Sequence, residues 1–109
     1  MLLYRQQTMS RDDFLYCIAH ARDQFEDTIH FILGDLNINA LANPDNYLSR
    51  YLTDYKLINN DPTHISGSLI DHVYIHKSVL GRFDIKTVLH SVYFTDHDTV
   101  VLKIKNSNE

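Results

Sequence analysis

The sequence predicts an α/β domain of the α+β kind, with one mixed β-sheet and about two helices packed on one of its faces. Three observations lead to this prediction. A buried strand that ends at a turn is expected near residue 33, a segment with apolar residues at helical spacing precedes it, and short β-rich runs dominate the second half of the chain. With 109 residues, 44% of them hydrophobic, the chain is sized for a single core.

The N-terminal part is expected to hold a short strand and a helix. The apolar run at residues 2–4 suits a strand. A helix is expected over residues 10–24, because Ser10 and Asp13 have the spacing of an N-terminal cap and apolar side chains then recur on one face. We expect that face to pack on the buried strand.

The buried strand is expected at residues 29–33. Alternate side chains would face opposite sides of the sheet, and both sides are apolar enough to need covering. Gly34 ends the run, because glycine lets the backbone bend tightly without steric cost. The turn leaves the Asp35 carboxylate and the Asn37 amide at the carboxyl end of the strand, the edge at which open α/β sheets bind ligands.

The second half of the chain is expected to combine a helix with several strands. The helix is expected over residues 45–54, after a cap-and-turn cluster. Residues 59–68 read as a loop because Pro62 and Gly67 lie among polar side chains. Strands are expected at residues 57–58, 69–76, 85–93 and 99–105, with a polar turn at 95–98 and a frayed tail at 106–109. Residues 1–105 are therefore expected to form one domain.

Two polar positions interrupt the apolar strands. Asp71 shares a predicted strand face with Val73 and Ile75, where a lone carboxylate is costly, so it needs a hydrogen-bonding partner. His97 lies in the polar turn between two strands. An imidazole held by a buried carboxylate recurs in hydrolytic sites, because the carboxylate fixes its tautomer and stabilises its charged form. Asp71 and His97 could form such a pair.

Two interpretations of these polar residues are open. In the first, oxygen and amide groups of Asp35, Asn37 and Asp96 suit a Mg²⁺ ion and a phosphate ester next to the Asp71–His97 pair. In the second, the Asp and Asn residues only form turns, His97 is exposed and Asp71 points outward from an edge strand. The pattern of residues alone favours the second interpretation.

The amino-acid composition argues against several classes of protein. The net charge is −4, so the chain has no general basic surface of the kind that drives nonspecific binding to nucleic acids. Its one cysteine, Cys17, excludes an internal disulfide and a cysteine-based zinc cluster and suits a reducing compartment. No apolar run is long enough for a membrane span, and no secretory signal is visible. We expect a soluble, intracellular protein of the nucleus or cytoplasm, with no membrane partner.

Three segments, in this order, resemble the C-terminal half of the endonuclease/exonuclease/phosphatase superfamily. They are Gly34-Asp35-Leu36-Asn37, Ser68-Leu69-Ile70-Asp71-His72-Val73-Tyr74 and Thr95-Asp96-His97-Asp98. The pieces Tyr4-Arg5 and Pro62-Thr63-His64 make the chain most similar to the apurinic-like endonuclease domains of non-LTR retrotransposons. The resemblance implies a partial DNase I-like sandwich.

The resemblance also implies catalytic roles by position. It implies that Asp35 positions or activates the attacking water, or protonates the leaving oxygen, and that Asn37 orients the phosphate. It implies that His97 contacts the phosphate and that Asp71 orients His97. The implied catalytic residues are thus Asp35, Asn37, Asp71 and His97.

The implied ligands are a metal ion and a phosphate ester. The resemblance makes Asp96 the ligand of a Mg²⁺ ion, and it makes Tyr4 and Asn37 the residues that bind substrate. The family's metal-binding Glu, from its N-terminal half, has no counterpart, since Glu26 and Glu109 are the only glutamates here. The Mg²⁺ site is therefore expected to be weak or incomplete.

The resemblance covers about half of the family's domain, which bears on partners and function. One apolar face of the sheet is expected to be exposed, and a missing N-terminal half or a second copy of the chain would cover it. The leading expectation is a fragment of a Mg²⁺-dependent phosphodiesterase that hydrolyses DNA, with the activity of the isolated chain left open. A noncatalytic remnant or interaction module is the first alternative, and a phosphomonoesterase of the same superfamily is the second.

Overall fold

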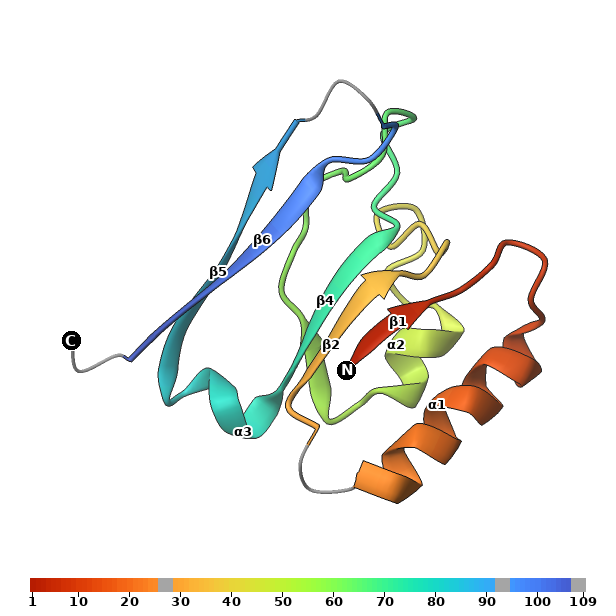
Figure 1. The fold of residues 1–109 in the computed structure, drawn as a ribbon, viewed down its shortest axis with the longest axis horizontal. Helices are drawn as coiled ribbons and strands as arrows, with labels where there is room; N and C mark the ends of the chain where they lie inside the picture. Colours follow the sequence, from red (N-terminus) through yellow and green to blue (C-terminus); the bar gives the residue numbers. More distant parts are fainter. Residues whose placement is uncertain (26–28, 92–94, 107–109) are drawn as a thin grey trace.

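The computed structural model describes residues 1–25, 29–91 and 95–106. Figure 1 shows the chain as a small central sheet, with the two longer helices to one side of it and a long hairpin and a short helix to the other. The described elements are β1 (Leu2–Tyr4), α1 (Arg11–Phe25), β2 (Phe31–Asp35), α2 (Tyr47–Tyr51), β3 (Tyr55–Leu57), β4 (Asp71–His76), α3 (Lys77–Leu80), β5 (Phe83–His90) and β6 (Thr99–Asn106). Both α and β elements are present, as the sequence predicted.

The central sheet has four strands in the order β1-β2-β4-β3. It is mixed, because β1 runs parallel to β2 while β4 is antiparallel to both β2 and β3. The prediction of a single sheet was wrong: β5 and β6 pair only with each other among the described strands. Since β4 already has a neighbour on each side, the chain that follows it has no adjacent edge to join and packs on a face of the sheet instead.

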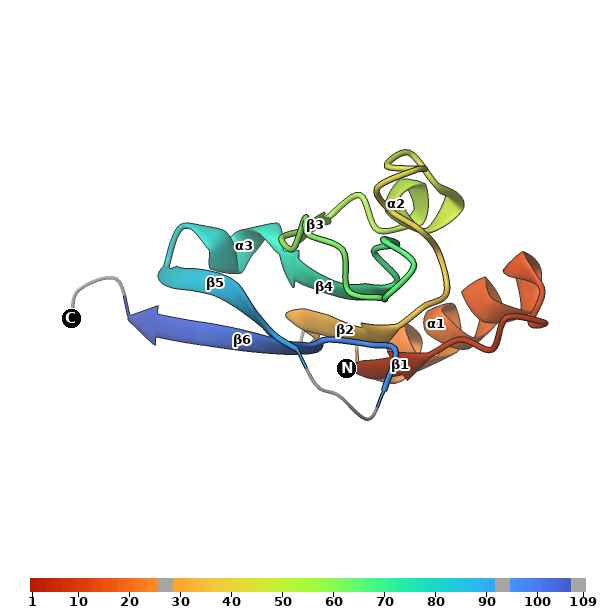
Figure 2. The same ribbon diagram turned by 90° about the horizontal axis from the view of Figure 1, so that it is seen from above.

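The sheet separates two apolar clusters. On one face, Ile32 and Tyr74 pack with the buried Phe14 and Ile18 of α1 and with Leu48 of α2. This agrees with the prediction of about two helices on one face. Figure 2 shows these helices on one side of the central sheet and the β5–β6 hairpin on the other.

The hairpin covers part of the second face. Val73 and Ile75 of β4 are buried there, and Phe31 of β2 packs against the same cluster as Ile85 and Leu102 of the hairpin. The resulting layers are helices, sheet and hairpin. Because β2 and β4 are covered on both faces, their central residues, 31–33 and 73–75, are apolar on both sides of the sheet.

Several element boundaries differ from the predicted ones. Helix α1 agrees closely, with the Ser10 hydroxyl accepting a hydrogen bond from the Asp13 amide at 3.1 Å. Helix α2 is shorter than predicted because Asn46 caps it two residues before Leu48, accepting hydrogen bonds from the Leu48 and Ser49 amides. The four-residue α3 was not predicted, because so short a segment has no detectable apolar period.

The predicted strands also shift by a few residues. Strand β4 begins at Asp71, later than the predicted start at residue 69. Strand β5 begins at Phe83, earlier than the predicted start at residue 85. Two predicted segments, 92–93 of the strand and 107–109 of the tail, lie outside the described residues. Among the described helices, none has the length and apolar character required to cross a membrane.

Gly34 lies where the backbone of β1 leaves no room for a side chain on β2. Its φ is +153°, which L side chains rarely adopt, and a Cβ built on it would lie 1.7 Å from the carbonyl oxygen of Leu3. Because Leu3 pairs with Gly34 in the register of β1 and β2, any side chain at position 34 would push the two strands apart. The glycine is therefore required by the parallel strand pair. It lies inside β2, which continues to Asp35, so the prediction that Gly34 ends the strand was wrong.

We predict that Gly34→Ala lowers the free energy of unfolding by about 3 kcal/mol or more, since backbone strain and a steric clash act together. Chemical denaturation of the two proteins measures the difference. Gly81→Ala is the matched control, because a Cβ at Gly81 meets open space and should change the stability little. A Gly34→Ala variant as stable as the wild type would contradict the described pairing of β1 with β2.

Candidate functional site

The pairing of β2 with β4 brings two carboxylates together. Asp35 is the last residue of β2, Asp71 is the first residue of β4, and the two are direct partners in the antiparallel register. Direct partners point to the same face of a sheet, with Cβ atoms roughly 4.5–5.5 Å apart. Two like charges in this position repel each other, so the arrangement needs a compensating positive group.

His97, in the turn between β5 and β6, can supply that group when its imidazole is protonated. Its Nδ1 lies 2.8 Å from Asp71 Oδ2, and its Nε2 lies 3.7 Å from Asp35 Oδ2. The imidazole thus bridges the two carboxylates, hydrogen-bonded to one and close to the other. All three side chains are partly exposed: 31% for His97, 24% for Asp35 and 20% for Asp71. The group is fixed by the protein and still open to solvent.

The loop before β4 holds the turn that carries His97. The buried Thr63 hydroxyl accepts hydrogen bonds from the amides of Ile70 and Asp71, at 3.2 and 3.1 Å. The Thr63 carbonyl accepts another from the Asp98 amide at 2.7 Å. One residue therefore positions both the start of β4 and the residue after His97. Sequence reasoning missed Thr63 as a positioning residue, because a threonine in a polar loop does not reveal that it is buried.

The pKa values of Asp35 and His97 are both raised above their ordinary values. Partial burial raises the pKa of Asp35 above its ordinary value, and the nearby charge of Asp71 raises it further. The hydrogen bond to Asp71 raises the pKa of His97, with added support from the charges of Asp71 and Asp35, against a smaller opposing effect of burial. A carboxylate that gains a proton more readily thus lies beside an imidazole that keeps its proton to higher pH.

The same three residues form a group that could hold a metal ion. One ligand atom from each of Asp35, Asp71 and His97 lies within 4.8 Å of the others. Carboxylate oxygens are the ligands that hard divalent cations prefer. Asp96, the metal ligand implied by the resemblance, is not part of this group. Its side chain is exposed, and its backbone carbonyl accepts a hydrogen bond from the Ile65 amide.

The structure places Tyr4 and Asn37 at the same end of the sheet. Tyr4 pairs with Asp35 across β1 and β2, so the row Tyr4, Asp35, Asp71 crosses three strands on one face. The Asn37 amide donates a hydrogen bond to Asp35 Oδ1 at 3.2 Å, and its side-chain amide donates to the carbonyl of Arg5. Asn37 has a φ of +52°, which turns the chain away from the strand end. Asn37 is therefore hydrogen-bonded both to the Asp35 carboxylate and to the residue that follows β1.

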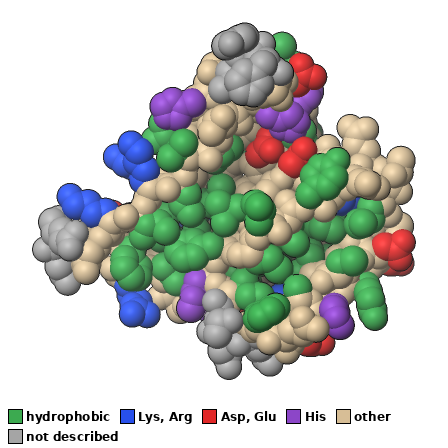
Figure 3. Space-filling view, in the orientation of Figure 1, with side chains coloured by type: hydrophobic (Ala, Val, Ile, Leu, Met, Phe, Trp, Pro, Cys, Tyr) green, Lys and Arg blue, Asp and Glu red, His purple; other side chains and the backbone are tan. Residues whose placement is uncertain are grey.

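A shallow hollow of about 220 Å³ adjoins the carboxylates. It lies where β2, β4 and β6 meet, with Asp35, Asp71 and Asp98 on its polar side and Leu33 and Val100 on its apolar side. Figure 3 shows acidic and histidine side chains gathered at the upper end of the sheet, above a face that is largely hydrophobic. From this side a small molecule could reach Asp35 and Asp71, while His97 is not among the residues that line the hollow.

Two further histidines lie near the site. The ring of His64 meets the ring of His97 edge-on, with centroids 5.0 Å apart. His72 is buried: its Nε2 lies 2.8 Å from the Ile38 carbonyl and its Nδ1 lies 3.2 Å from the Tyr74 hydroxyl. Burial lowers the pKa of His72, which suits a neutral ring that donates at Nε2 and accepts at Nδ1. We assign His72 a structural role.

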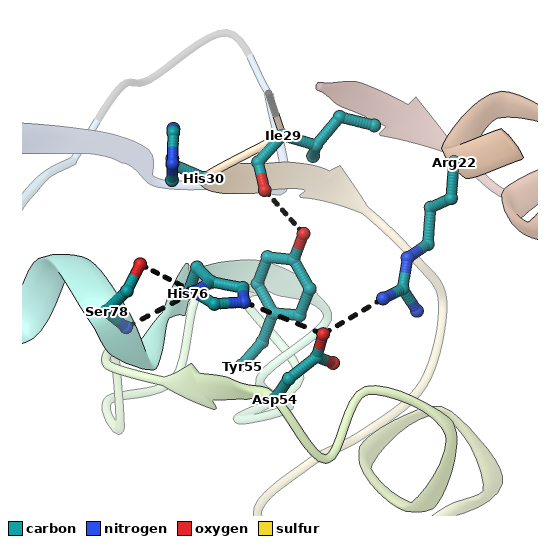
Figure 4. Close-up of a pocket in the computed structure, with 7 residues that line it drawn as sticks. All are labelled: Arg22, Ile29, His30, Asp54, Tyr55, His76 and Ser78. Carbon is teal, nitrogen blue, oxygen red and sulfur yellow. Dashed lines mark hydrogen bonds and ion pairs between the residues drawn. The ribbon is translucent and has the colours of Figure 1, made fainter. Parts of the chain in front are cut away.

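A second polar cluster lies at the opposite end of the sheet, around a cavity of about 240 Å³ (Figure 4). The Asp54 carboxylate accepts a hydrogen bond from the Arg22 guanidinium at 3.0 Å and lies 3.6 Å from His76 Nε2. The Tyr55 hydroxyl donates to the Ile29 carbonyl at 2.6 Å. These groups satisfy one another and tie α1 and β3 to the start of β2, so we assign the cluster a structural role.

Comparison with protein-family models, with curated proteins and with solved structures finds no match for this chain. The function therefore has to be argued from the geometry of the site. Its central feature is the chain of contacts from Asp71 through His97 to Asp35.

We predict that the imidazole of His97 titrates above its ordinary pKa of 6.5 in the metal-free protein, and that Asp71→Asn lowers that pKa. A folded-state pKa above the unfolded value means that the interaction stabilises the fold fully below about pH 6.5 and is lost as the pH rises through the folded pKa. NMR titration of the His97 ring protons in EDTA measures both values. Asp45→Asn, an exposed residue outside the site, is the control. Identical titration curves for the wild type and Asp71→Asn would refute the pairing.

Proposed function

We propose that this chain is part of a Mg²⁺-dependent phosphodiesterase of the endonuclease/exonuclease/phosphatase type, most similar to retrotransposon endonucleases, and that it hydrolyses DNA. The observation that carries the proposal is the His97 imidazole held between the carboxylates of Asp71 and Asp35. A carboxylate–imidazole pair beside a second carboxylate with a raised pKa combines a cation for the phosphate with a group for proton transfer. The shallow hollow next to them gives access for a phosphate ester.

The chemistry follows from the protonation of the two groups. Asp71 stabilises the charged form of His97, which can donate a hydrogen bond from Nε2 to a nonbridging phosphate oxygen and so offset the negative charge that develops at phosphorus. Asp35, with its raised pKa, can accept a proton from the attacking water or give one to the leaving oxygen. Asp71 acts through His97 and is a positioning residue.

Mg²⁺ is the proposed cofactor. The donor set fits a hard cation in part, because Asp35 and Asp71 offer carboxylate oxygens within reach of each other. A bound Mg²⁺ would withdraw charge from the phosphate ester and the leaving oxygen. With two carboxylates in the described group, the ion would keep several of its waters and bind weakly. Asp96 would have to turn toward this group to act as a ligand.

The second candidate function is that of a noncatalytic interaction module, and the open edge of the sheet favours it. On β1, Leu2 is 84% exposed and Tyr4 is 65% exposed. β1 is an edge strand, so its outer backbone groups could pair with a strand of another chain. Such a module would keep the fold and require no metal.

A plasmid-nicking assay tests the proposed function. We predict that the purified chain nicks supercoiled DNA in Mg²⁺ and not in EDTA. Asp35→Asn and His97→Ala should each lower the rate by roughly 10²-fold or more, since each removes a group that acts on the reacting atoms. Asp45→Asn should leave the rate unchanged.

The controls separate chemistry from folding. Circular dichroism and thermal melts must show that each variant is folded before its rate is compared. Equal nicking by the wild type and Asp35→Asn would overturn the role assigned to Asp35. A folded wild type that does not nick DNA would favour the interaction module instead.

A further inference from the structure

The outward face of the β5–β6 hairpin carries three lysines. Ile85 and Leu102 point toward the central sheet, so the side chains that alternate with them point away from it. Lys86, Lys103 and Lys105 are therefore on the outer face, and all three are exposed. Here we call these three residues the lysine patch.

The register makes the lysine patch costly for the fold. Lys86 and Lys103 are direct partners across the hairpin, and like charges in that position destabilise a strand pair. The ion pairs found among residues 1–25, 29–91 and 95–106 include none of the three lysines. Asp84 is the direct partner of Lys105, whereas Lys86 and Lys103 face each other with no acidic residue opposite either of them. A bound anion would relieve the repulsion between Lys86 and Lys103.

The lysine patch is a local exception in an acidic protein. The whole chain has a net charge of −4, whereas β5 and β6 together carry three lysines against one acidic residue, Asp84. The three lysines line a shallow hollow of about 560 Å³ on the hairpin, together with Asp84. In Figure 3, Lys and Arg side chains gather on the hairpin side of the molecule, away from the acidic cluster.

The spacing of the patch fits a phosphate backbone. Lys103 and Lys105 lie two residues apart on one face of a strand, a separation of about 6.8 Å. This is close to the distance between neighbouring phosphates along a nucleic-acid strand. Lysine ammonium groups are flexible point charges, which suits contact with phosphates and not the reading of base edges. The patch is therefore suited to binding that is independent of base sequence.

Strand β6 connects the candidate site to the lysine patch, which lies on the opposite, outward face of the hairpin. Strand β6 starts at Thr99, two residues after His97, and runs on to Lys103 and Lys105. Figure 1 shows the hairpin extending from the upper end of the sheet toward the far side of the molecule. A polymer with a phosphate at the site would therefore pass around the edge of the hairpin to reach the three lysines.

We infer that the lysine patch binds the sugar-phosphate backbone of a nucleic acid and holds it along the β5–β6 hairpin. The inference rests on the proposed function for its choice of partner, and it adds where that partner lies. The repulsion between Lys86 and Lys103 lowers the stability of the fold, and we attribute the presence of both lysines to this binding role.

Fluorescence anisotropy with labelled DNA tests the inference. Binding is measured in EDTA, with a duplex probe and a single-stranded probe, across a range of salt concentrations. The triple variant Lys86→Gln, Lys103→Gln, Lys105→Gln should bind at least roughly tenfold more weakly. Its salt dependence should be shallower by about 0.9 per lost phosphate contact for the duplex and about 0.7 for the single strand.

A matched control removes three exposed cations elsewhere. The variant Arg11→Gln, Arg50→Gln, Lys56→Gln changes the net charge by the same amount and should bind as the wild type does. The variant Lys86→Glu provides a second test, with Tm and DNA binding as its two measurements. It places opposite charges across the hairpin, so we expect a higher Tm together with weaker DNA binding.

The outcomes separate this inference from the proposed function. Selective loss of binding by the patch variant supports the inference, whether or not the protein nicks DNA. Equal affinities for the wild type and the patch variant would overturn it, even if nicking in Mg²⁺ were observed. A wild type that binds phosphatidylserine vesicles and neither DNA probe would also overturn it.

Discussion

The antiparallel register of β2 and β4 is the constraint on which the rest of the structure depends. Both strands are covered on both faces, with Ile32 and Tyr74 facing the helices and Val73 facing the hairpin. A slip of one residue would exchange the two faces and expose the core, so the register is strongly specified. Because Asp35 and Asp71 are partners in this register, the packing of the core also fixes the distance between the two carboxylates.

The hairpin contributes both structure and chemistry. It buries apolar residues against the sheet, and its turn carries His97 to the two carboxylates. Thr63 links this turn to the start of β4, so the imidazole is held from two directions. The polar side chains at the two ends of the sheet therefore differ in how they are paired. At one end, Arg22, Asp54 and His76 satisfy one another, while at the other an imidazole and two carboxylates remain partly open to solvent.

The sequence was informative where burial and alternation act locally. The apolar runs predicted the main strands and helix α1, and the costly position of Asp71 predicted that it needs a partner. The separate sheet formed by β5 and β6 could not be predicted, since alternation does not tell whether a strand joins a sheet edge or packs on its face. The register between β2 and β4 and the burial of Thr63 depend on contacts between distant segments, which no local pattern contains. The resemblance grouped Asp35, Asp71 and His97, but it also implied a metal role for Asp96, which lies outside the group in this structure.

The central claim is that Asp35, Asp71 and His97 form a site that binds a divalent cation and acts on phosphate esters. Anomalous diffraction from crystals grown with Mn²⁺, a hard cation that can replace Mg²⁺, tests it most directly. We predict an anomalous peak at the upper end of the sheet, bound by the carboxylates of Asp35 and Asp71. A peak found only elsewhere on the protein, or none at saturating Mn²⁺, would contradict the claim.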